Sequence, residues 1–447
     1  MAAPAAASVA ILTALIVATP AQPAGVARSA TGTETASTVT VDFAEPIPSQ
    51  PSMVGFLHGM DETMPPDHMI RPLRPALWRG VPRTAPYDRA RSFGARYVLL
   101  LSDAWGYPPT WSKRGAPYNH LRQWAQFVRT VARQSRGWDV IFDVWNEPDT
   151  ETFWVGSREQ LFETYAVAAR VLHEELGDNV QVIGPSLGVY NAGYIGAFLD
   201  ACLSEPGCLV SALSWHEFPA PSPPISTIVD HLRDARHRFL ERTRYAGLGL
   251  QRVYVTESVN AYSQYRPGEI LAYLSALERG GADGAVRSCF EDPRGANQCF
   301  NHTLDGLVTP GTSLPRAAWW AYKLYADGVV SRVRSTDSKS IAALASSDSA
   351  TPGVPQLLLG RFSGSPDSRR EARVSITLRG LDALPPFAAA SRVTVVVQQL
   401  PDRGTRRLSS PKLVTQQDVP VTGGATHVVI PRFRSHDLYA LDVVAPA

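Results

Sequence analysis

The middle of the chain alternates between short apolar runs and longer amphipathic stretches. Each apolar run has the length and composition of a β-strand, and a segment with helical periodicity follows it after a loop. The runs lie at residues 54–57, 76–79, 97–101, 140–145, 180–183, 210–215, 253–256 and 285–290. Eight such units between residues 54 and 327 match the roughly 250 residues of a (β/α)8 barrel. The pattern therefore predicts an α/β fold built on a TIM barrel.

The amphipathic stretch Arg158–Leu176 has the clearest helical signal. Apolar residues recur on one of its faces, as expected for a helix that packs on a core. Ser157 and Gln160 stand at the spacing of a capping box, which predicts that the helix begins there. A second helix, which contains the adjacent Trp319 and Trp320, is predicted at residues 317–325 and would close the barrel.

After Val329 the hydrophobic period changes to two. Apolar and polar residues alternate at residues 374–378, 393–397, 427–430 and 438–443, with Pro- and Gly-rich turns between them. The pattern predicts that residues 54–329 form the barrel and that residues 330–447 form a C-terminal β-sandwich packed on its flank. Residues 39–43 alternate in the same way, so the segment 39–53 is expected to add a strand to the sandwich.

The N-terminus has the pattern of a secretory signal peptide. Residues 9–18 form a short apolar core, and small residues follow it up to Ala27. This core is too short to span a bilayer, and no other segment is apolar enough to do so. We expect residues 1–27 to be removed, residues 28–38 to be a flexible segment, and the mature protein to be secreted into the extracellular space.

The amino-acid composition limits the kinds of partner that the protein is expected to bind. The chain has 447 residues, of which 44% are hydrophobic, enough for a large barrel and a smaller second domain. Its formal net charge is only +2, and Lys and Arg do not cluster in runs. These features argue against a nucleic-acid partner or a polybasic membrane surface and favour a neutral substrate. No motif indicates a metal ion or another cofactor, and none is expected.

The four cysteines are spaced as two local pairs. Cys202 and Cys208 flank one short loop, and Cys289 and Cys299 flank another. Local pairing is the natural choice among the three possible connectivities. Disulfide bonds fit an exported protein, and neither pair has the spacing of zinc ligands.

Two of the predicted strands end at a glutamate. Glu147 follows the run at 140–145, and Glu257 follows the run at 253–256. Catalytic residues of barrel enzymes lie at the carboxyl ends of strands, and a spacing of three β/α units lets two strands face each other across the barrel. A pair of carboxylates is the minimum set for hydrolysis of a glycosidic bond. Partial desolvation would raise the pKa of Glu147 and suit it to donate a proton.

With Asn146-Glu147-Pro148, Glu257 and a barrel followed by a sandwich, the chain resembles the clan A retaining glycoside hydrolases, most closely family 39. The resemblance spans nearly all of residues 39–444. It implies that Glu147 is the acid/base, that Glu257 is the nucleophile, and that Asn146 binds the sugar 2-hydroxyl. It also implies that Arg79 keeps Glu257 ionised, and such charge pairing lowers the pKa of a carboxyl group.

Two positions depart from the pattern of the clan. Phe218 stands where the clan usually has a tyrosine that bonds the nucleophile, and Phe290 stands where it usually has a tryptophan beneath the sugar. Both changes fall where the cleaved sugar would bind. They leave open an alternative reading of the chain as a non-catalytic carbohydrate-binding protein on a degenerate barrel.

Other polar and aromatic residues at the strand ends complete the expected substrate-binding set. His216 follows the sixth predicted strand, where barrel enzymes place functional side chains. Further polar and aromatic residues stand in the loops after the first, third and eighth predicted strands. Each of them could contact the substrate or simply pack within its loop. The expected contacts are Arg79, Asn146, His216, His58, Asp103, Trp105, Phe290 and Glu291.

A rival motif lies after the fifth predicted strand. Gly184, Ser186 and Gly188 match the Gly-x-Ser-x-Gly nucleophile elbow of serine hydrolases. A helix should begin directly after that serine, and here further loop residues intervene. The sequence therefore predicts a secreted retaining glycosidase that acts on an oligosaccharide, polysaccharide or glycoside, with a serine hydrolase using Ser186 as a less favoured alternative.

Overall fold

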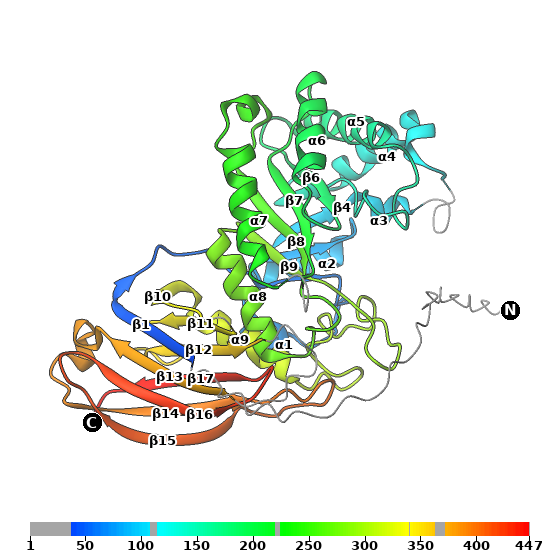
Figure 1. Ribbon diagram of the computed structural model, residues 1–447. Coiled ribbons are helices and arrows are strands. Elements are labelled where there is room, and N and C mark those ends of the chain that lie inside the picture. Colours follow the sequence, from blue (N-terminus) through cyan, green and yellow to red (C-terminus); the bar gives the residue numbers. More distant parts are fainter. Residues whose placement is uncertain (1–36, 108–113, 220–223, 339, 363–371, 447) are drawn as a thin grey trace, which may run out of the picture. The chain divides into compact units, whose positions relative to one another are not determined.

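The computed structural model describes residues 37–107, 114–219, 224–338, 340–362 and 372–446. The predicted signal peptide lies outside these residues, as does most of the predicted flexible segment. Thr35–Ala447 form one compact unit (Figure 1). No helix in the described ranges is both long and apolar enough to cross a membrane.

Parallel strands close into a barrel, as the sequence predicts. Within the described residues, eight strands pair in chain order, and the pairing of Phe56 with Arg287 closes the ring. The strands are β2 (Gly55–Leu57), β3 (Leu77–Gly80), β4 (Arg96–Leu100), β5 (Val140–Asp143), β6 (Gln181–Leu187), β7 (Ala212–Glu217), β8 (Arg252–Ser258) and β9 (Gly284–Arg287). The predicted fold class is confirmed.

Two strand ends differ from the prediction in ways that affect the site. β6 continues to Leu187, so the segment Gly184-Pro185-Ser186 lies inside a strand instead of in the loop after it. β9 ends at Arg287, so Phe290 and Glu291 belong to the following loop. The residue types near a strand end do not determine which residue makes the last pairing with the neighbouring strand. The sequence pattern therefore misplaces these two ends.

Helices cover the outside of the barrel (Figure 1). The described helices are α1 (Asp67–Ile70), α2 (Thr84–Ser92), α3 (Leu101–Trp105), α4 (Leu121–Gln134), α5 (Arg158–Leu176), α6 (Ala192–Ser204), α7 (Thr227–Ala235), α8 (Pro267–Gly280) and α9 (Ala317–Gly328). α5 begins where predicted, because Ser157 and Gln160 form both hydrogen bonds of a capping box. α9 includes the predicted closing helix and ends three residues later.

The remaining strands form a second sheet around its own core. Among the described residues its order is β15-β14-β17-β12-β11-β10-β1-β13-β16. The strands are β1 (Ser37–Pro46), β10 (Arg332–Ser335), β11 (Ile341–Ser346), β12 (Gln356–Arg361), β13 (Ala372–Arg379), β14 (Arg392–Leu400), β15 (Lys412–Pro420), β16 (Thr426–Phe433) and β17 (Leu438–Val444). β1 lies between β10 and β13, so the N-terminal strand pairs inside the C-terminal sheet.

Strands β11 and β12 are buried on both faces, which explains why the sequence pattern missed them. Ile341, Ala343 and Ala345 pack into the core of the second sheet. Ala342 and Leu344 pack instead into the core of the barrel helices. Figure 1 shows α8 beside these strands. A strand covered on both faces is apolar throughout, so the alternation that marks a half-exposed strand is lost.

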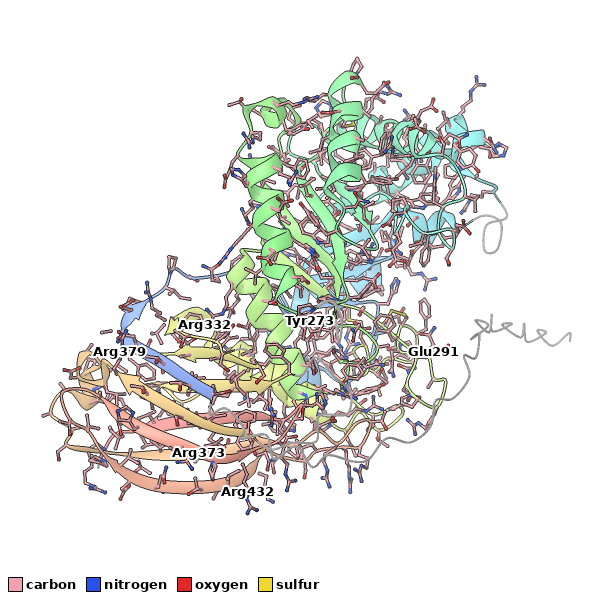
Figure 2. The ribbon with its side chains drawn as sticks, viewed as in Figure 1. Tyr273, Glu291, Arg332, Arg373, Arg379 and Arg432 are labelled. Carbon is pink, nitrogen blue, oxygen red and sulfur yellow. A yellow bond between two sulfur atoms is a disulfide. The ribbon has the colours of Figure 1, made fainter. Side chains whose placement is uncertain are left out.

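Arg332 and Gly268 make close contacts between α8 and the second sheet. Arg332 of β10, which is labelled in Figure 2, is buried and donates hydrogen bonds to both carboxylate oxygens of Glu278 at 3.1 to 3.3 Å. Gly268, in the first turn of α8, donates its N–H to the His436 carbonyl oxygen at 2.7 Å. A Cβ atom at Gly268 would collide with the carbonyl oxygens of Arg361 and Asp437. The helix can therefore approach the sheet only with glycine at this position.

Gly268→Ala should destabilise the protein by about 1 to 3 kcal/mol, the usual cost of overpacking a tight contact. Gly247→Ala is the matched control, because a Cβ atom there has no neighbour within 4 Å. Its effect should stay within about 1 kcal/mol of the unchanged protein. Urea unfolding of both variants measures the difference. A Gly268→Ala protein as stable as its control would contradict this account of the junction.

Candidate active site at the barrel mouth

A buried arginine connects the strand ends at the mouth of the barrel. Arg79 lies on β3 and is fully buried. Its Nε donates to Asp143 at 3.0 Å, Nη1 to Glu257 at 2.9 Å and Nη2 to Asn146 at 2.8 Å. Three strand ends are thus fixed relative to one guanidinium group, whose planar fork gives these bonds fixed directions.

Two carboxylates make the burial of this cation possible. Burial alone would lower the pKa of Arg79, but Asp143 and Glu257 outweigh it and raise the pKa above its ordinary value. Asp143, at the end of β5, also accepts a hydrogen bond from Ser186 Oγ at 2.7 Å. Such a network is stable only while every charge keeps its partner.

Glu147 and Glu257 lie on either side of His216. The His216 Nδ1 atom is 2.8 Å from Glu147 Oε1, and its Nε2 atom is 3.9 Å from Glu257 Oε1. The His216 side chain is buried, whereas Glu147 and Glu257 are 17% and 12% exposed. Both carboxylates are therefore accessible from the mouth of the barrel and stand one imidazole ring apart.

The backbone at Glu147 is held in an uncommon conformation. Its φ is 43°, and its N–H donates to the Ser186 carbonyl oxygen at 2.9 Å. A residue with a side chain in this region costs on the order of 1–3 kcal/mol, and such residues cluster at functional sites.

The pKa shifts of the two glutamates run opposite to the sequence prediction. Burial alone would raise the pKa of Glu147, but the hydrogen bond and charge of His216 lower it below the ordinary value. Burial raises the pKa of Glu257, and the opposing charges of His216 and Arg79 do not cancel this effect. Arg79 lowers the pKa of Glu257 less than predicted, because the same guanidinium group also pairs with Asp143. The predicted directions were wrong because the sequence does not show that His216 lies beside Glu147 or that Asp143 pairs with Arg79.

A cavity of about 290 Å³ opens at the two glutamates. Aromatic rings form much of its wall, and the Phe218 and Phe290 rings pack edge to face at 5.6 Å. The lining residues are Leu57, His58, Arg79, Leu100, Asp103, Tyr107, Asn146, Glu147, Phe153, Phe218, Glu257, Cys289, Phe290, Asn297, Cys299 and Phe300. A small cavity with convergent polar groups and apolar walls is typical of a site for a small ligand.

Most of the predicted contact residues meet at this cavity. Arg79, Asn146, His58, Asp103 and Phe290 line it. The His58 Nε2 atom lies 2.9 Å from Asp103 Oδ2, which orients both side chains. His216 does not line the cavity itself, but it contacts both glutamates and packs against the Phe218 ring of the cavity wall at 5.6 Å.

Trp105 and Glu291 lie elsewhere. Trp105 is buried in the hydrophobic core, with its ring 5.2 Å from that of Trp124, and it does not line the cavity. The sequence places Trp105 after a predicted strand, but it does not show that helix α3 turns this side chain toward the core. Glu291, which is labelled in Figure 2, is exposed. It lines a different hollow with Asp402 and Arg403. Its displacement follows from the early end of β9.

Ser186 has a structural role in place of the nucleophilic one. It is fully buried in β6, donates to Asp143 and lies 2.6 Å from Ser214 Oγ. A nucleophile elbow needs an exposed hydroxyl with a histidine beside it. The serine instead holds Asp143 in place beneath Arg79.

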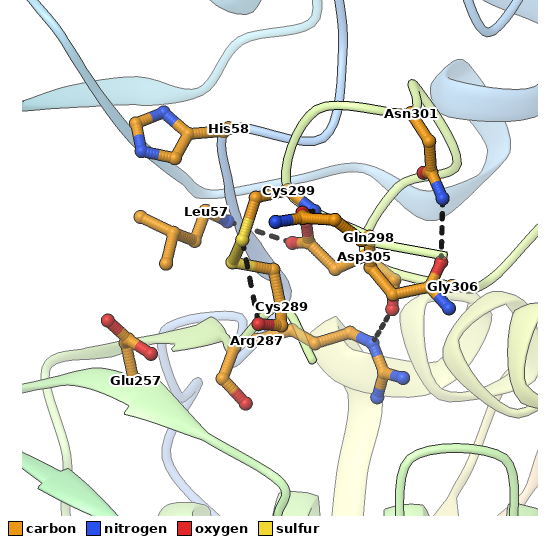
Figure 3. Close-up of a disulfide and its surroundings, with 12 residues drawn as sticks. Leu57, His58, Glu257, Arg287, Cys289, Gln298, Cys299, Asn301, Asp305 and Gly306 are labelled. Atoms are coloured by element: carbon orange, nitrogen blue, oxygen red, sulfur yellow. Dashed lines mark hydrogen bonds between the residues drawn. A yellow bond between two sulfur atoms is a disulfide. The ribbon is translucent and has the colours of Figure 1, made fainter. Parts of the chain in front are cut away.

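The two local disulfides are formed as predicted. Cys202 pairs with Cys208, with Cα atoms 5.3 Å apart, and Cys289 pairs with Cys299 at 5.1 Å. The second bridge lies at the cavity, and Figure 3 shows it together with His58 and Glu257. Disulfides are typical of proteins in oxidising compartments.

Sequence reasoning missed Asp143. Asp143 is a charged residue inside an otherwise apolar run, which was an available signal. Tyr107 donates a hydrogen bond to Asp103 from within the cavity wall. In the part of the chain that the structure describes, no group of three or more His, Cys, Asp or Glu residues is arranged to hold a metal ion. The groups present suit proton transfer and nucleophilic attack.

Comparisons with known proteins support the fold. No protein-family model matches the sequence, and no curated protein sequence matches it. Among solved structures, the GH39 enzyme from Xanthomonas axonopodis pv. citri is similar, with a TM-score of 0.67 at 16% identity, over 94% of this chain and 100% of that one.

Two further structures share the architecture. A monomeric beta-xylosidase from Caulobacter crescentus CB15 has a TM-score of 0.67 at 14% identity, over 92% of this chain and 100% of that one. N2152 from Neocallimastix frontalis has a TM-score of 0.72 at 20% identity, with the same coverage. The predicted resemblance to family 39 is confirmed at the level of fold.

Arg79→Leu should destabilise the protein by about 3 to 5 kcal/mol at neutral pH, because Asp143 and Glu257 would stay buried without a cation. The loss should shrink as pH falls from 8 to 5. A carboxyl group whose pKa is raised by folding binds its proton more tightly in the folded state, so acid restores stability. Urea unfolding at each pH measures both effects.

Arg133→Leu is the control for this experiment, because Arg133 is exposed and pairs with Glu175 at the surface. It should change stability little at any pH. A loss for Arg79→Leu that is small, or that is constant between pH 8 and 5, would contradict the buried network.

Proposed function

We propose that the protein is a secreted glycoside hydrolase that acts with retention of anomeric configuration. The observation that carries this proposal is the placement of Glu147 and Glu257 at one small cavity, separated by a single imidazole ring. Retaining enzymes keep their two carboxyl groups close together, because one of them attacks the sugar directly. The structural similarity to a GH39 enzyme and a beta-xylosidase supports the same class of substrate.

In this mechanism the two glutamates have different roles. Glu257 attacks the anomeric carbon and forms a covalent glycosyl-enzyme, while Glu147 donates a proton to the departing oxygen. Glu147 then removes a proton from water, which displaces the sugar from Glu257. Asn146, held by Arg79, presents its amide to the sugar beside the nucleophile.

The proton distribution of the free site is part of this proposal. The raised pKa of Glu257 and the lowered pKa of Glu147 favour a proton on the nucleophile before substrate binds. The transition state favours the reverse, because positive charge develops at the anomeric carbon and attracts an ionised Glu257. The two carboxyl groups titrate as a coupled pair, so their apparent pKa values belong to the pair.

A carbohydrate-binding protein without catalysis is the second candidate. Phe218 and Phe290 favour it, because their packed rings supply an apolar platform and no hydroxyl group for Glu257. The disulfides and the predicted signal peptide fit secretion under either reading. Turnover of any glycoside decides between the two candidates.

Glu257→Gln should abolish hydrolysis of aryl pentosides and hexosides, because an amide cannot form the covalent intermediate. Glu147→Gln should lower kcat by about 10²- to 10⁴-fold on nitrophenyl glycosides. The loss should be smaller with a dinitrophenyl leaving group, which departs with little protonation. Steady-state kinetics on both leaving groups measure this difference.

Glu291→Gln is the matched control, since Glu291 is exposed and outside the cavity, and it should keep the parent kinetics. Sustained turnover by Glu257→Gln would reject its role as nucleophile. An equal loss on both leaving groups would reject Glu147 as the acid. Binding of sugars without turnover by the unchanged protein would favour the non-catalytic reading.

His216→Gln should move both limbs of the pH profile of kcat/KM toward higher pH. His216 lowers the pKa of Glu147 and of Glu257, so its removal raises both. The two limbs of kcat/KM report the two apparent pKa values of the coupled pair in the free enzyme, and both values rise, so the profile shifts as a whole.

His231→Gln is the control for the pH profile. His231 lies 2.9 Å from the buried Glu217, but neither residue lines the cavity. Its profile should match that of the parent protein. A His216→Gln profile that is unmoved or shifted toward acid would contradict the electrostatic role assigned to His216.

A further inference from the structure

A second, larger cavity adjoins the catalytic one. Its volume is about 590 Å³, and it shares His58, Cys299 and Phe300 with the smaller cavity. The other lining residues are Met60, Asp61, Glu62, Thr63, Trp78, Val81, Arg83, Ala85, Pro86, Tyr97 and His302. The shared residues form the boundary between the two spaces, so the cavities lie side by side at the mouth of the barrel.

The larger cavity lies on the side of the mouth away from the proposed acid. Its wall consists of residues that follow β2, β3 and β9, together with Trp78 on β3 and Tyr97 on β4. The residues that it shares with the catalytic cavity follow β2 and β9, and β9 is four strands away from β5, the strand before Glu147, in the ring of eight. β9 is also the neighbour of β8, which carries Glu257. The leaving group must stand beside the acid that protonates it. The larger cavity therefore faces the part of the substrate that stays on the nucleophile.

The chemistry of the larger cavity suits a sugar ring. Phe300 is 68% exposed and stacks on His58 with ring centroids 5.3 Å apart, which offers an aromatic face. His302 Nδ1 is buried and has no hydrogen-bond partner among the described residues. Asp61, Glu62 and Arg83 add both acceptors and donors. Mixed charges beside an aromatic face favour a neutral polyhydroxylated ligand over an anion or a cation.

We propose that this larger cavity binds the second sugar residue of the glycone, the part of the substrate that forms the covalent intermediate. The inference rests on the proposed function and adds a substrate class to it. The protein prefers glycosides whose retained part has at least two neutral sugar residues. The boundary formed by His58 and Phe300 then lies at the linkage between these two residues.

The first test compares aryl glycosides that carry one or two copies of the same sugar. We expect kcat/KM to be about tenfold or more higher for the two-residue substrate, which corresponds to roughly 1.4 kcal/mol. Ala85→Trp should obstruct the larger cavity and bring this ratio close to one. Asp88→Trp is the matched control, because Asp88 is exposed on the same helix α2 and does not line the cavity. It should keep the ratio of the parent protein.

The second test measures binding without turnover, so that it stands even where the proposed function fails. Calorimetry with xylose and xylobiose, and with glucose and cellobiose, should give tighter binding for the two-residue sugar of at least one pair. Ala85→Trp should remove this advantage. Equal affinities within each pair, absent binding included, would overturn the inference. A parent protein that binds the longer sugar but hydrolyses no glycoside would reject the proposed function and retain the second-sugar site.

Discussion

The buried guanidinium of Arg79 determines how the site is built. A cation in the interior of a barrel is tolerated only with close partners, and here Asp143, Glu257 and Asn146 supply them. Because Asp143 and Asn146 come from the end of β5 and Glu257 from the end of β8, one residue sets the position of the proposed nucleophile relative to the amide beside the proposed acid. Ser186 extends the network by fixing Asp143 from below.

His216 is the common neighbour of the two carboxylates at the mouth of the barrel. Its buried ring contacts Glu147 and lies near Glu257, so the two carboxylates share one neighbour and do not titrate independently. The aromatic rings of Phe218 and Phe290 enclose the same space without adding a polar group. His216 and Arg79 therefore balance the charges of the carboxylates, and the aromatic side chains determine the shape of the cavity.

The sequence was most informative where one structural unit repeats along the chain. Short apolar runs between amphipathic stretches located the barrel strands, and the glutamates at the ends of β5 and β8 followed from the strand-end rule. It failed for Ile341–Ser346, because a strand covered by α8 and by the second core has no polar face. It also failed for the pKa directions of the two glutamates, since these depend on His216 and Asp143, which approach only in three dimensions.

Trapping of the covalent intermediate tests the central claim most directly. An activated 2-deoxy-2-fluoro glycoside of an accepted sugar should form a stable adduct, because fluorine slows hydrolysis of the glycosyl-enzyme more than its formation under an activated leaving group. Intact-mass measurement followed by peptide mapping locates the added sugar. The double-displacement mechanism predicts one sugar on the peptide that contains Glu257. An adduct on Glu147, or turnover that proceeds with inversion and leaves no adduct, would contradict it.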